Sequence, residues 1–313
     1  MTTTAIRRTA TDPLVYFGPL VGRRLPEGVE EQPYELFDVR PASPSIGAYV
    51  TGVQLDGGMS QDLLDELRRA LTEFKVLFFR DQAITREQHK AFAAQWGELE
   101  QHPFFKHTFG GQNDVDVATL AKDAMTTGVE NTWHNDVTWH ETPSYAAVLR
   151  AVEIPELGGD TLWCDTGLAY DVLPAEIKER IDTLEAEHDW IQAFGAGMDE
   201  ATRNTLREAF GPVTHPVVRV LPESGRRVIF VNFVFTTRIL GVSQEESDEL
   251  LGLLFRHVQR PEFQVRLNWE NDTVAMWDNR ACQHYASSDY FPARRVMERI
   301  SVVGDVPVGV SGS

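Results

Sequence analysis

Two histidines and an aspartate carry the clearest chemistry in this sequence. His134 and Asp136 stand two residues apart in the segment Trp133–Thr138. On an extended strand, residues at this spacing point to the same side, roughly 7 Å apart at the backbone, so one metal ion can bridge them. The pair alone is a weak signal, because the chain has nine histidines and many acidic residues. Its meaning depends on a third ligand.

His284 is the third ligand that the sequence favours. It lies in a short strand-like run, Cys282–Ala286, after the turn Trp277–Arg280. Two histidines and one carboxylate on one face of a metal leave three positions open, which suits ferrous iron that binds a bidentate cosubstrate and dioxygen. Three other histidines are rival ligands, or else hydrogen-bonded core residues: His140, His215 and His257.

Arg295 and Arg299 indicate an anion near the metal. Their even separation puts both side chains on one face of a strand. Two inward guanidinium groups are unfavourable unless they pair with carboxylate or sulfonate groups. The alternative is a basic stripe on the surface, with Arg294 and Glu298 alternating onto the opposite face. Spacing alone does not separate these two interpretations.

The domain that positions these residues is predicted to begin near Tyr34. Residues 1–33 carry four prolines and several glycines without hydrophobic periodicity, which predicts an extended or disordered arm. Residues 34–313 are predicted to form one domain, since a chain of 313 residues with 42% hydrophobic composition can bury one large core.

Short strands with helices inserted among them are predicted within this domain. The strand-like runs are 76–79, 115–120, 146–152, 161–164, 217–220, 228–232, 264–269, 273–277, 282–286 and 296–303. Helical periodicity and capping signals predict helices at 60–74, 85–96, 176–184, 200–210 and 243–258. This pattern indicates a mainly β protein with flanking helices, a β-sandwich or jelly roll. The polar segment 109–130, beside the metal motif, is a candidate lid.

The charge balance argues against nucleic acid or membrane partners. The 29 basic and 47 acidic residues give a net charge of −18, which repels phosphate backbones and anionic membranes. A small anionic substrate therefore needs a local basic pocket.

Cys164 and Cys282 suggest neither a disulfide framework nor a thiolate zinc site, so a reducing cytoplasm is expected. The apolar stretch 14–21 is too short for a membrane span. Helices 200–210 and 243–258 could pack against a second copy in a homo-oligomer.

Several sequence blocks, in order, carry a resemblance to a known family. They are WHNDVT at 133–138, GGDTLW at 158–163, HPVVR at 215–219, FTTR at 235–238, WDNR at 277–280, QHYA at 283–286 and RR at 294–295. From about Tyr34 to its end, the chain resembles the taurine dioxygenase family of iron(II)- and 2-oxoglutarate-dependent oxygenases. The family fold is a double-stranded β-helix, or jelly roll, in agreement with the strand pattern.

The resemblance implies roles for the residues already singled out. His134, Asp136 and His284 would bind Fe(II). Thr161 would hydrogen-bond a carboxylate of 2-oxoglutarate, and Arg295 would pair with its distal carboxylate. The implied reaction uses O2 and hydroxylates the carbon next to an anionic group, such as the sulfonate of taurine. The products would be succinate, CO2, sulfite and an aldehyde.

The resemblance also implies a substrate pocket. His102 and Arg299 would hold the sulfonate. At the far end of the substrate the chain departs from the taurine enzymes, because Phe105 lacks a tyrosine hydroxyl and Glu130 stands in place of an asparagine. Two further residues match apolar pocket positions, namely Phe194 and Phe235.

Other functions remain open on the sequence. Within the family, an alkylsulfatase-like enzyme acting on sulfate esters and an oxygenase of aryloxyalkanoates or other carboxylates need the same anion clamp. Outside the family, a zinc hydrolase could use His134, Asp136 and His140, although it leaves Arg295 and Thr161 without a role. A non-catalytic β protein that binds anions is a third class.

Overall fold

A seven-stranded sheet forms the larger layer of the molecule. The computed structural model describes residues 20–101, 116–126 and 130–310. The strand order is β1-β2-β3-β13-β5-β15-β4, in which β2 and β3 run parallel and the other neighbours antiparallel. The strands are β1 (Asp38–Pro41), β2 (Ala48–Thr51), β3 (Val76–Phe79), β13 (Val274–Asp278), β5 (Ala146–Glu153), β15 (Arg295–Val302) and β4 (Ala118–Lys122).

A second, three-stranded sheet packs against the inner face of the first. Its order is β12 (Gln264–Leu267), β6 (Thr161–Asp165) and β14 (Cys282–Ala286). Aromatic side chains fill the space between the sheets: the ring of Trp163 lies 5.5 Å from that of Phe78 and 5.7 Å from that of Trp277. Two facing sheets around such a core form the predicted jelly roll.

Burial on both faces explains why strand β3 has a continuous apolar sequence. Val76 and Phe78 belong to the core between the sheets, whereas Leu77 and Phe79 belong to the core under the helices on the other face. All four side chains are fully buried. Because successive side chains on a strand point to opposite faces, a strand covered on both sides needs apolar residues at every position.

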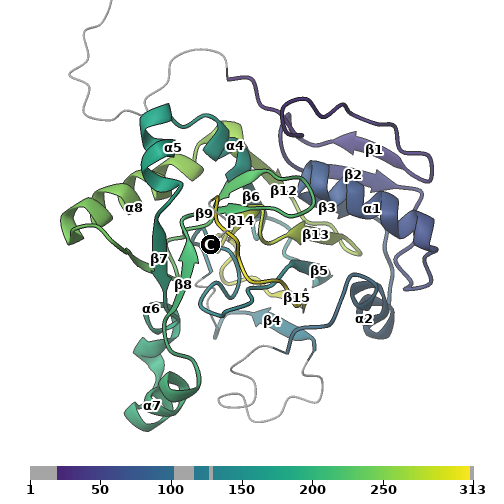
Figure 1. Cartoon of the computed structure of the whole chain (residues 1–313). Helices are drawn as coiled ribbons and strands as arrows, with labels where there is room; N and C mark the ends of the chain where they lie inside the picture. Colours follow the sequence, from purple (N-terminus) through teal and green to yellow (C-terminus); the bar gives the residue numbers. More distant parts are fainter. Residues whose placement is uncertain (1–19, 102–115, 127–129, 311–313) are drawn as a thin grey trace, which may run out of the picture.

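Helices α1 (Gln61–Phe74) and α2 (Arg86–Ala94) cover the outer face of the large sheet (Figure 1). Ser60 caps α1, because its side chain accepts a hydrogen bond from the backbone N–H of Leu63. Thr85 and Gln88 form a capping box at the start of α2. Both helices are confirmed: α1 was predicted from the Ser60 cap and helical periodicity, and α2 from a run that Gly97 stops.

The other side of the molecule holds two small sheets and most of the remaining helices (Figure 1). The sheets are β11 (Thr236–Ile239), β7 (Glu185–His188) and β8 (Val213–Pro216), and β10 (Arg227–Ile229) with β9 (Val218–Val220). The helices are α4 (Thr166–Asp171), α5 (Ala175–Ile181), α6 (Ile191–Phe194), α7 (Glu200–Ala209) and α8 (Gln244–Val258), with single 3₁₀ turns at Gly195–Gly197 and Pro261–Phe263. No helix among the described residues is both long and apolar enough to span a membrane.

Residues 20–33, the described part of the predicted arm, contain no helix or strand. They are nevertheless anchored, because the backbone carbonyl of Arg24 accepts hydrogen bonds from Lys75 Nζ and Arg226 Nη1. The side chain of Arg24 also pairs with Glu73 at 3.0 Å. The division into an arm and a domain at residue 33 stays a prediction.

Two predicted strands differ from the structure by three residues at one end. The run predicted at 115–120 is β4 at Ala118–Lys122, because pairing with β15 sets its position. The run predicted at 228–232 ends at Ile229. Soon after it the side chain of Asn232 accepts hydrogen bonds from the backbone N–H groups of Val234 and Phe235, which turns the chain. Strands β1, β2, β7, β8 and β11 were not predicted.

Candidate metal centre and cosubstrate pocket

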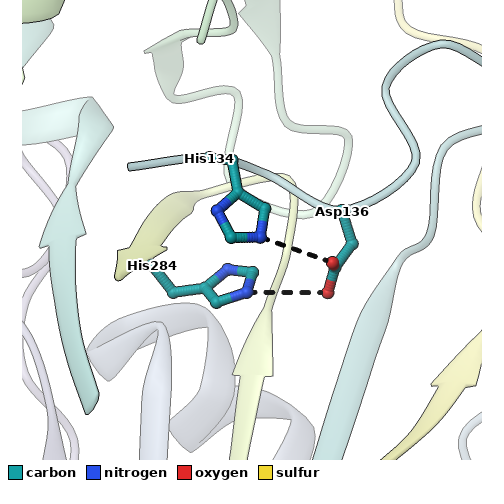
Figure 2. A group of neighbouring side chains, drawn as sticks. All are labelled: His134, Asp136 and His284. Carbon is teal, nitrogen blue, oxygen red and sulfur yellow. Dashed lines mark ion pairs between the residues drawn. The ribbon is translucent and has the colours of Figure 1, made fainter. Parts of the chain in front are cut away.

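A short antiparallel bridge brings the two predicted histidine ligands together. The backbone N–H of His134 donates to the carbonyl of His284 at 3.1 Å, and the reverse hydrogen bond is 2.8 Å long. The imidazole ring centroids are 4.2 Å apart. Strand β14 carries His284, so the second histidine is fixed by the small sheet and the first is fixed by the bridge to it (Figure 2).

Asp136 lies in a turn, not on the extended strand that its spacing from His134 predicted. The backbone leaves the bridge after His134, and Val137 adopts a left-handed conformation with φ 57°. Asn279 holds this turn, because its Oδ1 accepts from the N–H of Asp136 at 2.7 Å and its Nδ2 donates to the carbonyl of Asp136 at 3.0 Å. Asn279 is fully buried. The strand prediction was wrong at this point, although the two side chains still meet.

The three side chains form a cluster that can hold one metal ion. Nε2 of His134 and Nε2 of His284 each lie 3.8 Å from a carboxylate oxygen of Asp136, and one ligand atom from each residue lies within 4.8 Å of the others (Figure 2). Ligand atoms about 2.0–2.2 Å from one metal are roughly 3.0–3.6 Å apart, so these side chains need to move together only slightly to bind one ion. Two imidazoles and a carboxylate suit a divalent first-row metal.

The protonation of the imidazoles agrees with metal binding. Nδ1 of His134 lies 2.7 Å from the carbonyl of Thr132, which can only accept, so Nδ1 donates this hydrogen bond and Nε2 is the nitrogen left to bind a metal. Burial lowers the pKa of His284 to about 3, and the neighbouring His134 adds to the effect. His284 is therefore neutral at pH 7, the form that binds metals.

Arg299 contacts one of the three residues of the metal cluster. Its Nη1 donates to both carboxylate oxygens of Asp136, at 2.8 and 3.0 Å. Arg299 is on β15, and its guanidinium lines the same pocket as the two histidines. The sequence predicted that Arg299 binds the anionic group of the substrate; in this structure its guanidinium pairs with Asp136, and the substrate-binding role stays a prediction.

Thr161 and Arg295 form the part of the pocket predicted to hold 2-oxoglutarate. Trp269 donates from Nε1 to the hydroxyl oxygen of Thr161 at 3.0 Å, which leaves the Thr161 hydrogen to donate into the pocket. Arg295 is 6% exposed and donates from Nε to the carbonyl of Gly159 at 3.1 Å. Its Nη2 is buried and has no hydrogen-bond partner among the described residues. Burial lowers the pKa of Arg295.

A carboxylate is the group that this part of the pocket lacks. A buried guanidinium with an unpaired N–H is unfavourable unless an anion completes it. Gly159 permits the close approach, because a Cβ there would lie 3.0 Å from Cδ of Arg295, and its φ of 70° is one that side chains disfavour. The donor groups present therefore fit the distal carboxylate of 2-oxoglutarate.

The pocket joins the metal cluster to this carboxylate site and contains residues that the sequence did not single out. Its described lining includes His134, Thr161, His284, Arg295 and Arg299, together with Leu120, Lys122, Glu130, Leu149, Trp277 and Tyr290. Lys122 was missed because it faces the pocket only through the register of β4 on β15. Trp269 donates a hydrogen bond to Thr161, and Asn279 holds the turn at Asp136, but neither side chain is in the described pocket lining. Their local sequence has no signal that identifies them as partners of site residues.

The other five predicted substrate residues have different outcomes. Glu130 lines the pocket, and its carboxylate interacts electrostatically with Arg295. It therefore lies near the part of the pocket predicted to hold 2-oxoglutarate. Phe235 is buried with its ring 6.4 Å from that of His134, and the ring of Phe194 lies 6.0 Å from Phe235. His102 and Phe105 lie outside the described residues, and so do residues 109–115 and 127–129 of the predicted lid.

The rival histidines lie elsewhere. His140 is absent from the metal-binding cluster, and its Nδ1 is 3.3 Å from the hydroxyl of Thr142. His215 and His257 hydrogen-bond backbone carbonyls, as core histidines do. Cys282 is fully buried, and its Sγ lies 3.2 Å from the carbonyl of Asp278, so it is a packing residue.

A histidine–aspartate–histidine cluster inside a jelly roll is the arrangement of non-haem iron(II) oxygenases. Comparison with protein families identifies the particular family. Residues 38–301 match the model described as "Taurine catabolism dioxygenase TauD, TfdA family", and the chain belongs to this family. It is a 2-oxoglutarate-dependent dioxygenase, and its family uses 2-oxoglutarate, also called alpha-ketoglutarate, and dioxygen.

Individual relatives match over nearly the whole chain. The alpha-ketoglutarate-dependent sulfate ester dioxygenase of Pseudomonas putida is 38% identical, over 88% of this chain and 92% of its own. The alkylsulfatase of Acinetobacter baylyi is 33% identical, over 90% of each. A crystal structure of a taurine dioxygenase from Burkholderia xenovorans superposes with a TM-score of 0.76 at 38% identity, over 89% of this chain and 93% of that one.

Proposed function

We propose that this enzyme oxidises the carbon next to the sulfur-containing head group of a small organic anion. The reaction would take place at Fe(II) held by His134, Asp136 and His284, with 2-oxoglutarate as cosubstrate. One observation carries the proposal: two of the predicted metal ligands, His134 and His284, line the same pocket as Arg295, whose buried Nη2 has no hydrogen-bond partner among the described residues.

The chain's own residues would position the reactants. Arg295 would pair with the distal carboxylate of 2-oxoglutarate, and the hydroxyl of Thr161 would donate to the same group. Bound iron would supply the coordination positions at which cosubstrate and dioxygen meet. No side chain needs to act as a general base, because the work of the protein is positioning, charge pairing and exclusion of water.

Charge supports a substrate with one negative charge. Among the described residues, the cations Lys122, Arg295 and Arg299 and the carboxylates Glu130 and Asp136 surround the metal cluster and pocket. Together with a ferrous ion these groups carry three positive charges when Glu100 is protonated; burial raises the pKa of this neighbouring carboxyl to about 7. A 2-oxoglutarate dianion neutralises two of them, and a monoanionic sulfate ester or sulfonate neutralises the third.

Aromatic side chains next to a metal ligand support an alkyl group on the substrate. The edge-to-face contact of Phe235 with His134 starts a line of aromatic rings that continues to Phe194, which is 37% exposed. This line leads from a metal ligand toward solvent and suits an apolar chain better than the ammonium group of taurine. It favours an alkyl sulfate ester, the substrate class in the name of the Pseudomonas putida relative.

An alkylsulfonate is the second candidate, favoured by the match to the taurine dioxygenase structure. The two substrates give different products. Hydroxylation next to a sulfonate gives a compound that collapses to an aldehyde and sulfite, whereas hydroxylation next to a sulfate ester releases an aldehyde and sulfate. In both cases one atom of O2 would enter the substrate and the other would enter succinate, because 2-oxoglutarate is oxidised to succinate and CO2.

A substrate panel tests the proposal. Hexyl sulfate, hexanesulfonate, taurine and phenoxyacetate would each be incubated with Fe(II), 2-oxoglutarate and O2, and succinate, sulfate and sulfite measured. We expect hexyl sulfate to yield sulfate and succinate in equal amounts, and the His134→Ala variant to yield neither. Succinate formation driven only by phenoxyacetate would refute the sulfur head group. Sulfate release without oxygen or 2-oxoglutarate would indicate a hydrolase instead.

A further inference from the structure

An ion pair between Lys122 and Glu130 lies in the wall of the cosubstrate pocket. Lys122 Nζ is 2.9 Å from Glu130 Oε1, and the side chains are 19% and 38% exposed. Both residues line the pocket together with Arg295. Nothing in the proposed reaction uses this pair, and the resemblance to the family assigned no role to Lys122.

The strand register explains why Lys122 faces the pocket. Strand β4 is the edge of the large sheet and lies along β15, where Lys122 is directly opposite Arg295 and Ala118 is opposite Arg299 (Figure 1). Opposite residues of an antiparallel pair project on the same face of the sheet. Lys122 is therefore a third cation on the face that carries both arginines.

Glu130 brings a negative charge to the same place. Its carboxylate acts electrostatically on Arg295 and on Tyr290, which both line the pocket. Arg295 is the residue that would bind the distal carboxylate of 2-oxoglutarate, so Glu130 repels the group that Arg295 attracts. Lys122 offsets this repulsion as long as the ion pair holds.

We infer that the opposed charges of Lys122 and Glu130 set how tightly the pocket holds the distal carboxylate of 2-oxoglutarate and of its product succinate. This inference rests on the proposed role of Arg295. A pocket with Lys122 but without Glu130 would hold both dicarboxylates more tightly and would release succinate more slowly. A pocket with Glu130 alone would bind 2-oxoglutarate weakly.

A purely structural ion pair gives a different expectation. If Lys122 and Glu130 only fasten β4 to the chain before the metal motif, loss of either partner should disturb the pocket in the same direction. If the charges set the affinity for 2-oxoglutarate, loss of Lys122 should weaken binding and loss of Glu130 should strengthen it. A purely structural ion pair does not produce such opposite changes.

Calorimetric titration of the Mn(II)-loaded protein without oxygen tests the inference, with 2-oxoglutarate and succinate as probes. We expect Lys122→Met to weaken 2-oxoglutarate binding about threefold or more, Glu130→Gln to strengthen it by a similar factor, and the double variant to return near wild type. Succinate should follow the same order. Thermal unfolding of each variant checks that the fold is intact.

Lys90→Met is the matched control, because Lys90 forms a comparable ion pair with Asp116 at 2.8 Å but is not part of the described pocket lining. This variant should bind 2-oxoglutarate like wild type. Changes in the same direction for Lys122→Met and Glu130→Gln, or no change in either, would overturn the inference. Absence of 2-oxoglutarate binding in the wild-type protein would instead refute the proposed function.

Discussion

Replacing Arg295 by methionine should leave the ligand-free protein as stable as wild type or make it more stable, while abolishing its response to 2-oxoglutarate. Arg295 is nearly buried and donates one hydrogen bond to protein, to the carbonyl of Gly159, whereas its Nη2 has no partner in the described structure. Burial lowers its pKa. A lowered pKa means that the folded protein disfavours the charged guanidinium relative to the unfolded chain.

The size of the effect follows from two opposing contributions. Removing an incompletely paired buried charge relieves a desolvation penalty of several kcal/mol. Losing a hydrogen bond from a charged donor costs roughly 1.5–3 kcal/mol, and methionine keeps part of the packing. We therefore expect Arg295→Met to raise the free energy of unfolding by about 0–2 kcal/mol in the absence of ligands.

Arg280 is the matched control, because it is equally buried but fully paired. It donates to Asp278 at 2.9 and 3.0 Å and to Glu223 at 2.9 Å, and it stacks on Tyr145 at 4.2 Å. Burial opposes its charge, but the carboxylates of Asp278 and Glu223 outweigh burial and raise its pKa. Arg280→Met leaves Asp278 buried without its partner and should cost roughly 3–5 kcal/mol.

Urea denaturation of wild type and both variants measures these differences. The first series contains a chelator and no 2-oxoglutarate, and the second contains Mn(II) and 2-oxoglutarate at about 100 times the wild-type Kd. Ligand binding should stabilise wild type by about 2.7 kcal/mol more than Mn(II) alone, and should not stabilise Arg295→Met. The reasoning is refuted if Arg295→Met loses as much stability as Arg280→Met, or if it keeps the wild-type gain from 2-oxoglutarate.

Three further predictions concern the pocket, the metal turn and a core histidine. Thr161→Val removes one donor to 2-oxoglutarate and should raise its KM about tenfold with little change in kcat; an unchanged KM would contradict this role. Asn279→Ala leaves the backbone groups of Asp136 unpaired, so urea unfolding should show a loss of about 3 kcal/mol and calorimetry weaker Fe(II) binding; wild-type values in both would contradict it. Burial lowers the pKa of His89 to about 4, so the unfolded chain binds the extra proton between pH 6.5 and 4, and stability falls as pH falls through this range. His89→Met should reduce the loss between pH 7 and 5 by about 2 kcal/mol in urea unfolding, and an equal loss would show that His89 is not the source.

The core elements were predictable because local sequence and tertiary environment agree there. The run Val76–Phe79 is apolar at every position and is buried on both faces, and the Ser60 cap starts a helix as predicted. Strand β7 was missed because its sequence, Glu185–His188, is polar: only Ala186 and His188 are buried, and the partner strands β8 and β11 supply the rest of its environment.

The metal ligands were predictable as residue types, but their geometry was not. Asp136 lies in a turn with a left-handed residue at Val137, and Asn279, 143 positions after Asp136, holds this turn by hydrogen bonds. Lys122 was hidden for a similar reason, because only the register of β4 on β15 turns it toward the pocket. Such contacts belong to the fold and leave no local pattern in the sequence.

Fe(II) binding in the absence of oxygen tests the central claim most directly. Calorimetry would compare wild type with His284→Ala, which removes a cluster member, and with His140→Ala, which removes the neighbouring histidine outside the cluster. We predict one Fe(II) per chain in wild type and in His140→Ala, and at least about tenfold weaker binding in His284→Ala. Weakened binding in His140→Ala with wild-type binding in His284→Ala would contradict the account.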